Sequence, residues 1–494
     1  MNIAYTDKNR KYIFYIAFIL ILGTALRIYN IAAPNLWFDE AISVSNSGTI
    51  QQTYTLSNDT NLYWNPAAEK KLTFLPYESI DPQPCFYYSL LNLWIGLFGN
   101  SEFAIRILSA IFGIISIFLV YIFGNALFGR KAALCTALLL SISPIHIWYA
   151  QEARNYTLST FLVILVAYLL YIAIKKNNNY IWAAFSTVGI LSLYTNYLIS
   201  CIILSGWILF LAKKNRYLAK KMLITNLCIA AFLIPWAKIL LSHVLYVKNN
   251  FWTLRPAFDS LLITLRNFAV GYTGTKATSI LSLIIFSALI IIGIINLKDE
   301  KRGLLFSFLL LPITIIFLIS QIMPIYIDRQ LMLFSPFFYL LVAHGITNIR
   351  QTKVRTAAYI AVVLLIIPSL YNYFSGYMPM QETKYHQGAY IKEPFLPAIN
   401  YIENNWRDGD IIVHSHISTR PSFAYYQKRY GLKQDHNIAS DHNRIWAVLS
   451  FWPRNGVLNE DTLLLRETLD ARYTIIKSVE FDGIVLNLYK TNKS

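Results

Sequence analysis

Two adjacent carboxylates near the start of the chain, Asp39 and Glu40, are the residues best suited to do chemistry. They follow directly on the first long apolar segment. Trp37 and Phe38, whose side chains favour a membrane interface, precede them. A carboxylate held close to apolar surface is costly and is a functional candidate by default. We expect Asp39 to act as a catalytic base. The competing interpretation is a solvated helix start, where acids suit the first turn.

A second polar stretch, 148–156, joins two apolar segments and holds Glu152 and Arg154. The competing interpretation is an ion pair that closes the turn. An exposed pair contributes only about 0–1 kcal/mol, which is a weak reason to place charges at membrane level. We therefore favour a site role for both residues. His146, just before this stretch, is interpreted as structural.

Three more charged residues are candidates, and the first two have two interpretations each. Arg329 would present five donors to a phosphate, or it extends to the interface beside Asp328. Asp81 either lines the same outer cavity as Asp39 or, as we favour, caps a helix. Arg106 is expected to pair with a carboxylate of the first loop.

A metal site is weakly indicated. His414 and His416 lie on a predicted strand and would face the same side, as two metal ligands do. No further ligand is placed by spacing, so we favour a solvated strand face. The four cysteines lie in or beside apolar segments and imply no disulfide framework. The sequence indicates no cofactor with certainty, and a divalent metal is left open.

The composition predicts a multi-pass membrane protein. The chain has 494 residues, of which 56% are hydrophobic and only 14% charged, against about 25% charged in soluble domains. The net charge of +17 could indicate nucleic acid. The basic residues, however, form short clusters between apolar runs, which is the positive-inside pattern. We interpret the charge as topology and expect no nucleic-acid partner.

The apolar segments predict about eleven spans, each of about 20 residues. They are 11–30, 102–126, 131–149, 155–174, 180–198, 199–212, 222–241, 278–297, 303–323, 331–349 and 356–374. The pair 180–198 and 199–212 requires a very tight turn at 194–197. Segment 84–98 is short, and only a surface or re-entrant helix there leaves every basic cluster on one side. The N-terminus is then cytoplasmic and the C-terminus exoplasmic.

The chain divides into a transmembrane domain, 1–378, and an exoplasmic α/β domain, 379–494. The first domain includes a long exoplasmic loop, 31–101, which we expect to form juxtamembrane helices. In the second domain, 411–417, 445–450, 473–479 and 483–489 alternate like strands, and 398–406 and 460–470 read as helices. It contains no GxGxxG, so nothing marks a nucleotide site.

Several motifs, in order, resemble the GT-C membrane glycosyltransferases of the family-39-like group, the protein-mannosyltransferase and aminoarabinose-transferase type. The resemblance is good from about 11 to 210 and thinner to 350. The matching stretches are 36–41, 81–88, 97–106, 143–156, 193–197 and, more loosely, 328–331.

The resemblance implies a transferase that takes a sugar from a polyprenyl-phosphate donor at an active site open to the exoplasmic side. Asp39 matches the family's first-loop aspartate, which would be the catalytic base or an acceptor-binding carboxylate. Glu40 matches the neighbouring acid and Glu152 the second-loop acid. Relatives carry His-Pro-Pro or Lys-Pro-Pro where this chain has Gln83-Pro84-Cys85, so a lysine for phosphate or a histidine for metal is absent there.

The site prediction combines these residues. Asp39 takes the proton of the acceptor, which is a lipid, glycan or protein hydroxyl. The leaving lipid phosphate needs positive charge or hydrogen-bond donors. Donor-phosphate candidates are Arg329, Arg154 and Gln83; substrate-binding or metal candidates are Glu152, Asp81, Tyr87 and Tyr88.

Two other functions compete with transfer. A transporter or flippase of a lipid-linked or anionic solute would be expected to show repeated halves and broken spans, and the sequence shows no repeat. A membrane scaffold that presents its tail leaves the acidic pair and the 151–154 turn unexplained.

Overall fold

The structure is a computed structural model. It describes residues 2–48, 83–213, 215–250, 253, 255–379, 394–415, 419–430, 443–450, 460–481 and 483–491. Asp81 and His416 lie outside these residues. The chain forms two compact units. Unit 1 comprises Met1–Ile31, Pro82–Tyr87 and Arg106–Tyr390, and unit 2 comprises Ala32–Asp81, Tyr88–Ile105 and Ile391–Ser494.

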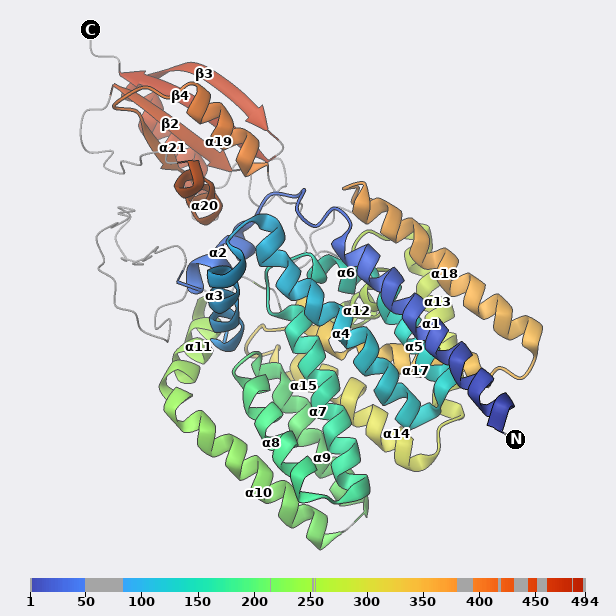
Figure 1. Cartoon of the computed structure of the whole chain (residues 1–494). Helices are drawn as coiled ribbons and strands as arrows, with labels where there is room; N and C mark the ends of the chain where they lie inside the picture. The colour runs from blue at the N-terminus through green and yellow to red at the C-terminus, as the bar shows by residue number, and fades with distance from the viewer. Residues whose placement is uncertain are drawn as a thin grey trace. The chain divides into compact units, whose positions relative to one another are not determined.

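Unit 1 is helical, and its long apolar helices run alongside one another (Figure 1). The helices are α1 (Asn2–Ile28), α4 (Glu102–Phe128), α5 (Arg130–Ile142), α6 (Pro144–Ala150), α7 (Tyr156–Lys176), α8 (Asn179–Leu193), η1 (Tyr197–Ile199), α9 (Ser200–Lys213), α10 (Arg216–Leu233), η2 (Ile234–Trp236), α11 (Ala237–Asn250), α12 (Phe258–Val270), α13 (Lys276–Ile295), α14 (Asp299–Leu305), the π-helical turn η3 (Phe306–Leu310), α15 (Leu311–Ile319), α16 (Asp328–Leu331), η4 (Met332–Phe334), α17 (Ser335–Asn348) and α18 (Thr352–Phe374).

Among the described residues, eight helices are long and apolar enough to cross a membrane, or nine if the bent pair α5 and α6 is one span. The short apolar helices include α3 (Phe86–Phe98), α8 and the stretch Tyr197–Trp207. The protein is therefore a polytopic helical membrane protein, as predicted. The tight turn between α8 and η1 is confirmed. The figure of eleven spans stays a prediction.

Glycines set the closest helix packing in unit 1, between α13 and α17. A Cβ atom built on Gly345 would collide with the Leu289 carbonyl, and one on Gly293 would collide with the Leu341 carbonyl. Small residues let membrane helices approach until their backbones touch, which gives dispersion contacts in place of the hydrophobic effect. The two glycines thus let α13 and α17 pack backbone against backbone.

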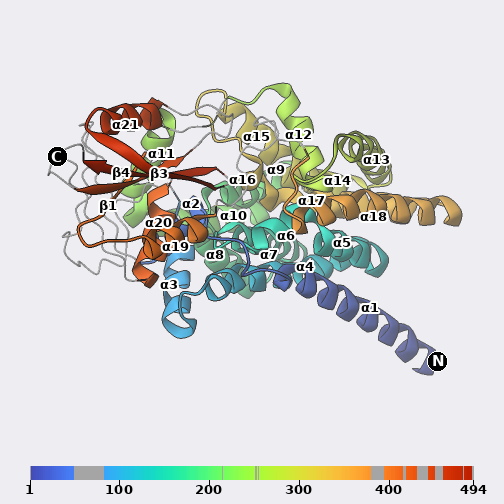
Figure 2. The same cartoon turned by 90° about the horizontal axis from the view of Figure 1, so that it is seen from above.

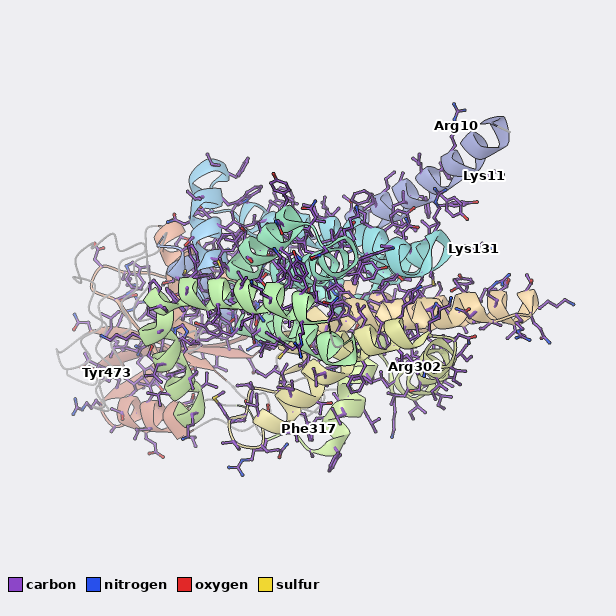
Figure 3. The ribbon with its side chains drawn as sticks, turned by 90° about the horizontal axis from the view of Figure 1, so that it is seen from below. Arg10, Lys11, Lys131, Arg302, Phe317 and Tyr473 are labelled. Carbon is purple, nitrogen blue, oxygen red and sulfur yellow. The ribbon has the colours of Figure 1, made fainter. Side chains whose placement is uncertain are left out.

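Basic residues gather at one end of unit 1. Figure 3 shows Arg10 and Lys11 of α1, Lys131 of α5 and Arg302 of α14 at the same end of the helices. The last turn of α7 carries Lys175 and Lys176. This arrangement is the one that the positive-inside pattern predicts for residues on one face of a membrane.

Unit 2 contains a small mixed sheet. Its elements are α2 (Phe38–Asn46), most of α3, α19 (Phe395–Asn404), β1 (Ile411–His414), α20 (Arg420–Tyr430), β2 (Arg444–Ser450), α21 (Glu460–Asp470), β3 (Tyr473–Phe481) and β4 (Ile484–Thr491). The strand order is β1-β2-β4-β3; β1 and β2 are parallel, and the other neighbours are antiparallel. Helix α21 covers one face of the sheet, and α19 and α20 lie on the other (Figure 2).

The alternating apolar residues predicted four strands, and all four form. Their inward side chains and Leu469 of α21 make one apolar core. The expectation of a solvated His414 was wrong. His414 is 8% exposed, its ring contacts Phe423 of α20, and its Nδ1 is 2.9 Å from Thr419 Oγ1. The reason is α20, a helix that the sequence analysis did not include.

Candidate functional site

A break between α5 and α6 shapes the bundle around the site. Ser143 has an extended backbone and caps α6 with its hydroxyl, and Pro144 takes the first helical position, so a new helix starts here. The two helices meet at 57°. The Leu140 and Ser141 carbonyls at the end of α5 accept hydrogen bonds from the fully buried Arg27 at 3.0 and 2.9 Å. Arg27 thus closes the break.

Gln151 fixes the turn that follows α6. Its Nε2 donates to the Arg27 carbonyl at 3.1 Å and to the Tyr29 carbonyl at 2.7 Å, which satisfies acceptors at the end of α1. Its Oε1 accepts from the Tyr373 hydroxyl of α18 at 2.7 Å. One amide therefore joins α1, the turn and α18.

Glu152 and Arg154, two of the predicted site residues, are buried in this turn. The Trp148 indole N–H donates to Glu152 Oε1 at 2.8 Å. The Arg154 guanidinium lies 5.7 Å from the centre of the Tyr156 ring, at cation–π distance. Both charged side chains are thus buried inside a bundle of apolar helices. They do not form a solvent-exposed ion pair.

Two candidates from the 81–88 motif connect to the same turn. Asn155 Nδ2 donates to Gln83 Oε1 at 3.1 Å. The Ser109 hydroxyl donates to the Arg154 carbonyl at 3.1 Å and lies 2.9 Å from the Tyr87 hydroxyl. Because Ser109 has one hydroxyl proton, Tyr87 is the donor of that second bond. The structure therefore brings Gln83 and Tyr87 to the Glu152–Arg154 turn.

Asp328 lies at the start of α16, and two neighbours on α12 bind its carboxylate. Thr264 donates to Oδ1 at 2.6 Å and Asn267 donates to Oδ2 at 2.8 Å. Gln330 Oε1 accepts from Asn196 of the α8–η1 turn at 3.0 Å. Hydrogen bonds to both carboxylate oxygens stabilise a buried Asp328.

A pair of tyrosines joins the two turns. The Tyr149 and Tyr272 hydroxyls are 3.0 Å apart. Glu152 and Arg329 both lie within electrostatic range of the Tyr149 hydroxyl, and Arg329 is itself buried. Burial raises the pKa of Tyr272 well above its ordinary value, and nearby Asp328 adds to that shift. The Tyr272 phenol thus keeps its proton, and either hydroxyl of the Tyr149–Tyr272 pair can be the donor.

These residues form one group, which we call the polar cluster; all are buried except Gln83, which is half-buried. Its members are Gln83, Tyr149, Glu152, Arg154, Tyr272, Asp328 and Arg329. It combines carboxylates, guanidiniums and hydroxyls inside an apolar bundle. Intramembrane charges of this kind mark substrate or ion sites, and guanidiniums suit phosphate.

Asp39 and Glu40 belong to unit 2, in the first turn of α2. Glu40 is fully buried, and Asp39 is half-buried. The backbone N–H of Leu36, just before α2, donates to the Tyr426 hydroxyl of α20 at 2.9 Å, and α2 packs on α20. The C-terminal part of the chain therefore holds the acidic pair in place.

Other candidates divide as follows. Tyr88 is buried in unit 2. Arg106 is buried and donates to the Ile31 carbonyl at 2.9 Å, at the start of the first loop. His146 lies 3.0 Å from Ser335 Oγ, a structural contact. No group of three or more histidine, cysteine, aspartate or glutamate side chains that could hold a metal occurs among the described residues.

Sequence reasoning missed Arg27, Gln151, Asp328 as a cluster member, and Tyr426. A signal existed for the first three, because each is a polar side chain at the end of an apolar segment. Tyr426 lies 390 positions from its partner Leu36, and no local pattern indicates such a contact.

Comparisons with known proteins show which proteins this chain is similar to. Residues 82–241 match the family described as dolichyl-phosphate-mannose-protein mannosyltransferase. A putative mannosyltransferase, YkcB of Bacillus subtilis, is 26% identical over 272 residues, which cover 54% of this chain and 36% of that protein. The chain thus spans little more than a third of the curated relative it matches.

Two crystal structures of ArnT from Cupriavidus metallidurans have a similar fold. The apo structure matches with a TM-score of 0.57 at 10% identity, covering 98% of both chains. The structure bound to undecaprenyl phosphate matches with a TM-score of 0.56 at 12% identity, covering 96% of this chain and 97% of that one. The likeness extends over the membrane helices and the C-terminal sheet.

Proposed function

We propose that this chain, which has the fold of the GT-C membrane glycosyltransferases, moves a sugar from a polyprenyl-phosphate donor to an acceptor hydroxyl on the exoplasmic face. The buried polar cluster of unit 1 supports this most directly. It places guanidiniums and hydrogen-bond donors at the end of an apolar bundle, where the phosphate of a lipid donor would lie while its chain stays in the membrane.

The reaction is a single displacement that inverts the anomeric carbon. The acceptor oxygen forms the new bond to that carbon, and the bond from the carbon to the lipid phosphate oxygen breaks. The leaving phosphate keeps the electron pair, and Asp39 takes the acceptor proton. Glu40 is the second acid of this motif, buried next to the base.

The polar cluster supplies the charge that the leaving phosphate needs. Arg329 and Arg154 are the cations. Asn155 donates to Gln83 Oε1, which orients the Gln83 amide with its NH₂ group as a donor toward phosphate. Glu152 and the Tyr149–Tyr272 pair contribute acceptors and donors for the sugar hydroxyls. The sugar is a hexose or pentose.

A transporter or flippase of a lipid-linked solute is the alternative. Transporters use the unwound backbone of broken spans to coordinate ions, and α5 and α6 form a broken span. In this chain, however, the carbonyls Leu140 and Ser141 accept hydrogen bonds from Arg27. A fixed guanidinium occupies these acceptors, which favours a static bundle.

The first prediction tests Asp39. The purified full-length protein in proteoliposomes is given polyprenyl-phosphate mannose or aminoarabinose and membrane extract as acceptor, and sugar release from the lipid is counted. Asp39→Asn removes the base and should lower transfer by roughly 10²–10⁴-fold. Asp259→Asn, an identical change at an exposed position on α12, should leave transfer unchanged. Wild-type turnover by Asp39→Asn would remove Asp39 from catalysis.

A flippase would move the lipid-linked sugar across the bilayer without transferring the sugar to an acceptor. If the lipid-linked sugar crosses the bilayer intact and no acceptor becomes glycosylated, the chain is a flippase. Mass spectrometry of surface glycans and lipids from a deletion strain then identifies the acceptor class.

A further inference from the structure

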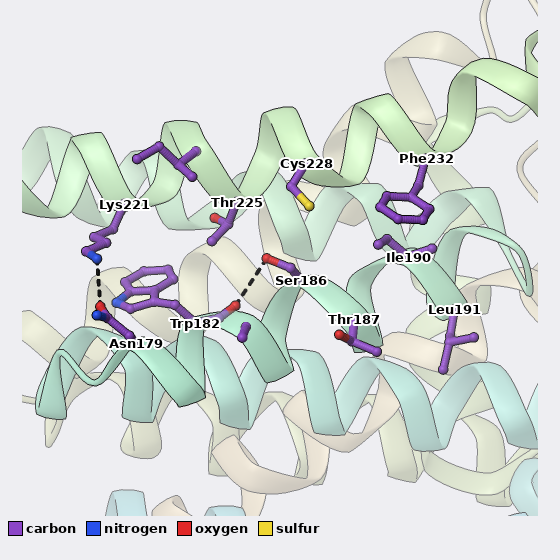
Figure 4. Close-up of a pocket in the computed structure, with 12 residues that line it drawn as sticks. Asn179, Trp182, Ser186, Thr187, Ile190, Leu191, Lys221, Thr225, Cys228 and Phe232 are labelled. Carbon is purple, nitrogen blue, oxygen red and sulfur yellow. Dashed lines mark hydrogen bonds between the residues drawn. The ribbon is translucent and has the colours of Figure 1, made fainter.

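A groove runs between α8 and α10, with a volume of about 540 Å³. This volume lies within the roughly 300–1,000 Å³ range of ligand pockets. Figure 4 shows its length, from Asn179 and Lys221 at one end to Leu191 and Phe232 at the other. None of its residues belongs to the polar cluster.

Most of the groove offers few unpaired polar groups to a ligand. Ile190, Leu191 and Phe232 line one part of it. Three hydroxyls line the groove further along, and those of Ser186 and Thr225 are already used within their own helices, whereas Thr187 is exposed. Ser186 donates to the Trp182 carbonyl at 3.1 Å, and Thr225 donates to the Met222 carbonyl at 3.0 Å. A hydrocarbon chain could lie along this part without leaving the Ser186 or Thr225 hydroxyl unpaired.

Donors collect at the Asn179 end. Lys221 Nζ donates to Asn179 Oδ1 at 2.6 Å, which uses one of its three protons. Trp182 is 2% exposed, and its indole N–H has no hydrogen-bond partner among the described residues. In Figure 4 the nitrogen edge of the indole is turned toward Asn179 and Lys221. A buried donor without a partner is costly and calls for an acceptor.

The surroundings favour an anionic acceptor from the membrane. Ile224 and Phe232 are 52% and 59% exposed in the protein alone, so the groove opens on a face that lipid covers. The exposed basic residues nearest in sequence to Asn179 and Lys221 are Lys175, Lys176, Arg216 and Lys220. Basic pockets between membrane helices attract acidic headgroups.

We propose that the groove binds one anionic glycerophospholipid. Its phosphate oxygens accept hydrogen bonds from Lys221, Asn179 and the Trp182 indole, and an acyl chain lies along the groove toward Phe232. A polyprenyl phosphate carries the same phosphate. We favour the glycerophospholipid because the groove's donors lie beside Asn179, at the start of α8. The turn at the other end of α8 contacts the neighbours of the polar cluster: Asn196 binds Gln330, and the Thr195 carbonyl binds Asn155.

Native mass spectrometry of the detergent-purified full chain tests this site. Phosphatidylglycerol should bind more tightly than phosphatidylcholine. Lys221→Gln should reduce that preference by about fivefold, the contribution of one charge near a membrane surface. Lys353→Gln, which removes the same charge from the exposed start of α18, should keep it. Trp182→Phe, which removes the indole N–H together with one ring of the side chain, should also weaken phosphatidylglycerol binding.

A second pair of variants tests the groove itself. Ala183 lines the groove and is exposed, so Ala183→Trp should fill it and block lipid binding while thermal unfolding stays unchanged. Ala357→Trp, on the exposed face of α18, should not block it.

Three results would overturn the proposal. They are equal binding of the two phospholipids by the wild type, equal losses in Lys221→Gln and Lys353→Gln, and displacement of phosphatidylglycerol by undecaprenyl phosphate at stoichiometric amounts. The last result would assign the groove to the carrier lipid.

Discussion

At Arg329, the contribution of the positive charge to phosphate binding can be measured separately from that of the planar shape of the guanidinium. A guanidinium presents a rigid, planar fork that meets two phosphate oxygens at once, whereas an ammonium is a point charge. Arg329 is held at the start of α16, which the Asp328 contacts with Thr264 and Asn267 anchor to α12. A role in phosphate binding therefore depends on geometry as well as charge.

We expect Arg329→Lys to keep the protein folded and to lower kcat for transfer on the order of 10²-fold, the cost of losing one well-placed donor. Arg329→Gln should cost more because the charge is lost too. Initial rates measured over a range of donor concentrations separate kcat from KM. Arg350→Lys, at an exposed position after α17, is the control. Equal rates for wild type and Arg329→Gln would exclude a role for this residue in leaving-group stabilisation.

At the scale of the element, Arg27 shows how a break in a membrane helix is stabilised. Backbone carbonyls in the membrane must be satisfied within the protein because water is absent. The Arg27 guanidinium supplies three hydrogen bonds, to Gly23, Leu140 and Ser141. The close approach that this requires is reflected at Gly113, where a Cβ atom would lie 3.1 Å from Arg27 Nε.

Arg27→Met should therefore destabilise the protein. Each of the two α5 carbonyls left unpaired costs about 1–3 kcal/mol, so thermal unfolding in detergent should begin at a clearly lower temperature. Arg27→Lys should restore part of the loss, since an ammonium can reach one or two of the carbonyls. Arg10→Met, at an exposed position on α1, serves as control. An unchanged unfolding temperature in Arg27→Met would mean that the break is stable without this cap.

Helix α20 has a comparable role for the acidic pair. Tyr426 contacts the chain at Leu36, three positions before Asp39, so it is a positioning residue for the proposed base. Tyr426→Phe removes one hydrogen bond, worth about 0.5–1.5 kcal/mol. We expect kcat to fall while the donor KM and the unfolding temperature stay near wild type. Tyr371→Phe, on the exposed face of α18, should change none of them; if Tyr426→Phe matches it, α20 does not position Asp39.

The sequence predicted these elements unequally. Apolar segments and alternating strands are local patterns, so most long helices and β1 to β4 were found near their observed bounds. Segment 222–241 is an exception, since α10, η2 and α11 extend from Arg216 to Asn250. Segment 131–149 was predicted as one span because its apolar content hides the Ser143–Pro144 helix start. Helix α20 was missed because its tyrosines and basic residues carry little apolar periodicity. Contacts such as Tyr426 with Leu36 depend on tertiary packing and leave no local trace.

At the scale of the whole molecule, α7 relates the two ends of unit 1. It has 21 residues and is therefore about 31 Å long, close to the roughly 30 Å thickness of a bilayer's hydrocarbon core. It begins beside Glu152 and Arg154 and ends at Lys175 and Lys176. The polar cluster and these basic residues thus lie at opposite ends of α7. Because clusters of lysine and arginine in the loops of a membrane protein favour its cytoplasmic side, the end of α7 at Lys175 and Lys176 is predicted to be cytoplasmic. The polar cluster is then predicted to face the exoplasmic side.

Helix α18 leads to the last prediction. It begins next to Lys353 and Arg355 and ends beside Gln151, to which Tyr373 donates. The chain therefore leaves the bundle at the face of the polar cluster, and residues 394–494 should be exoplasmic. Alkaline phosphatase fused to the C-terminus should be active and green fluorescent protein dark, with the reverse at the N-terminus. A fluorescent C-terminal fusion would place the chain's exit in the cytoplasm and, with it, the polar cluster on the side where an exoplasmic acceptor cannot reach it.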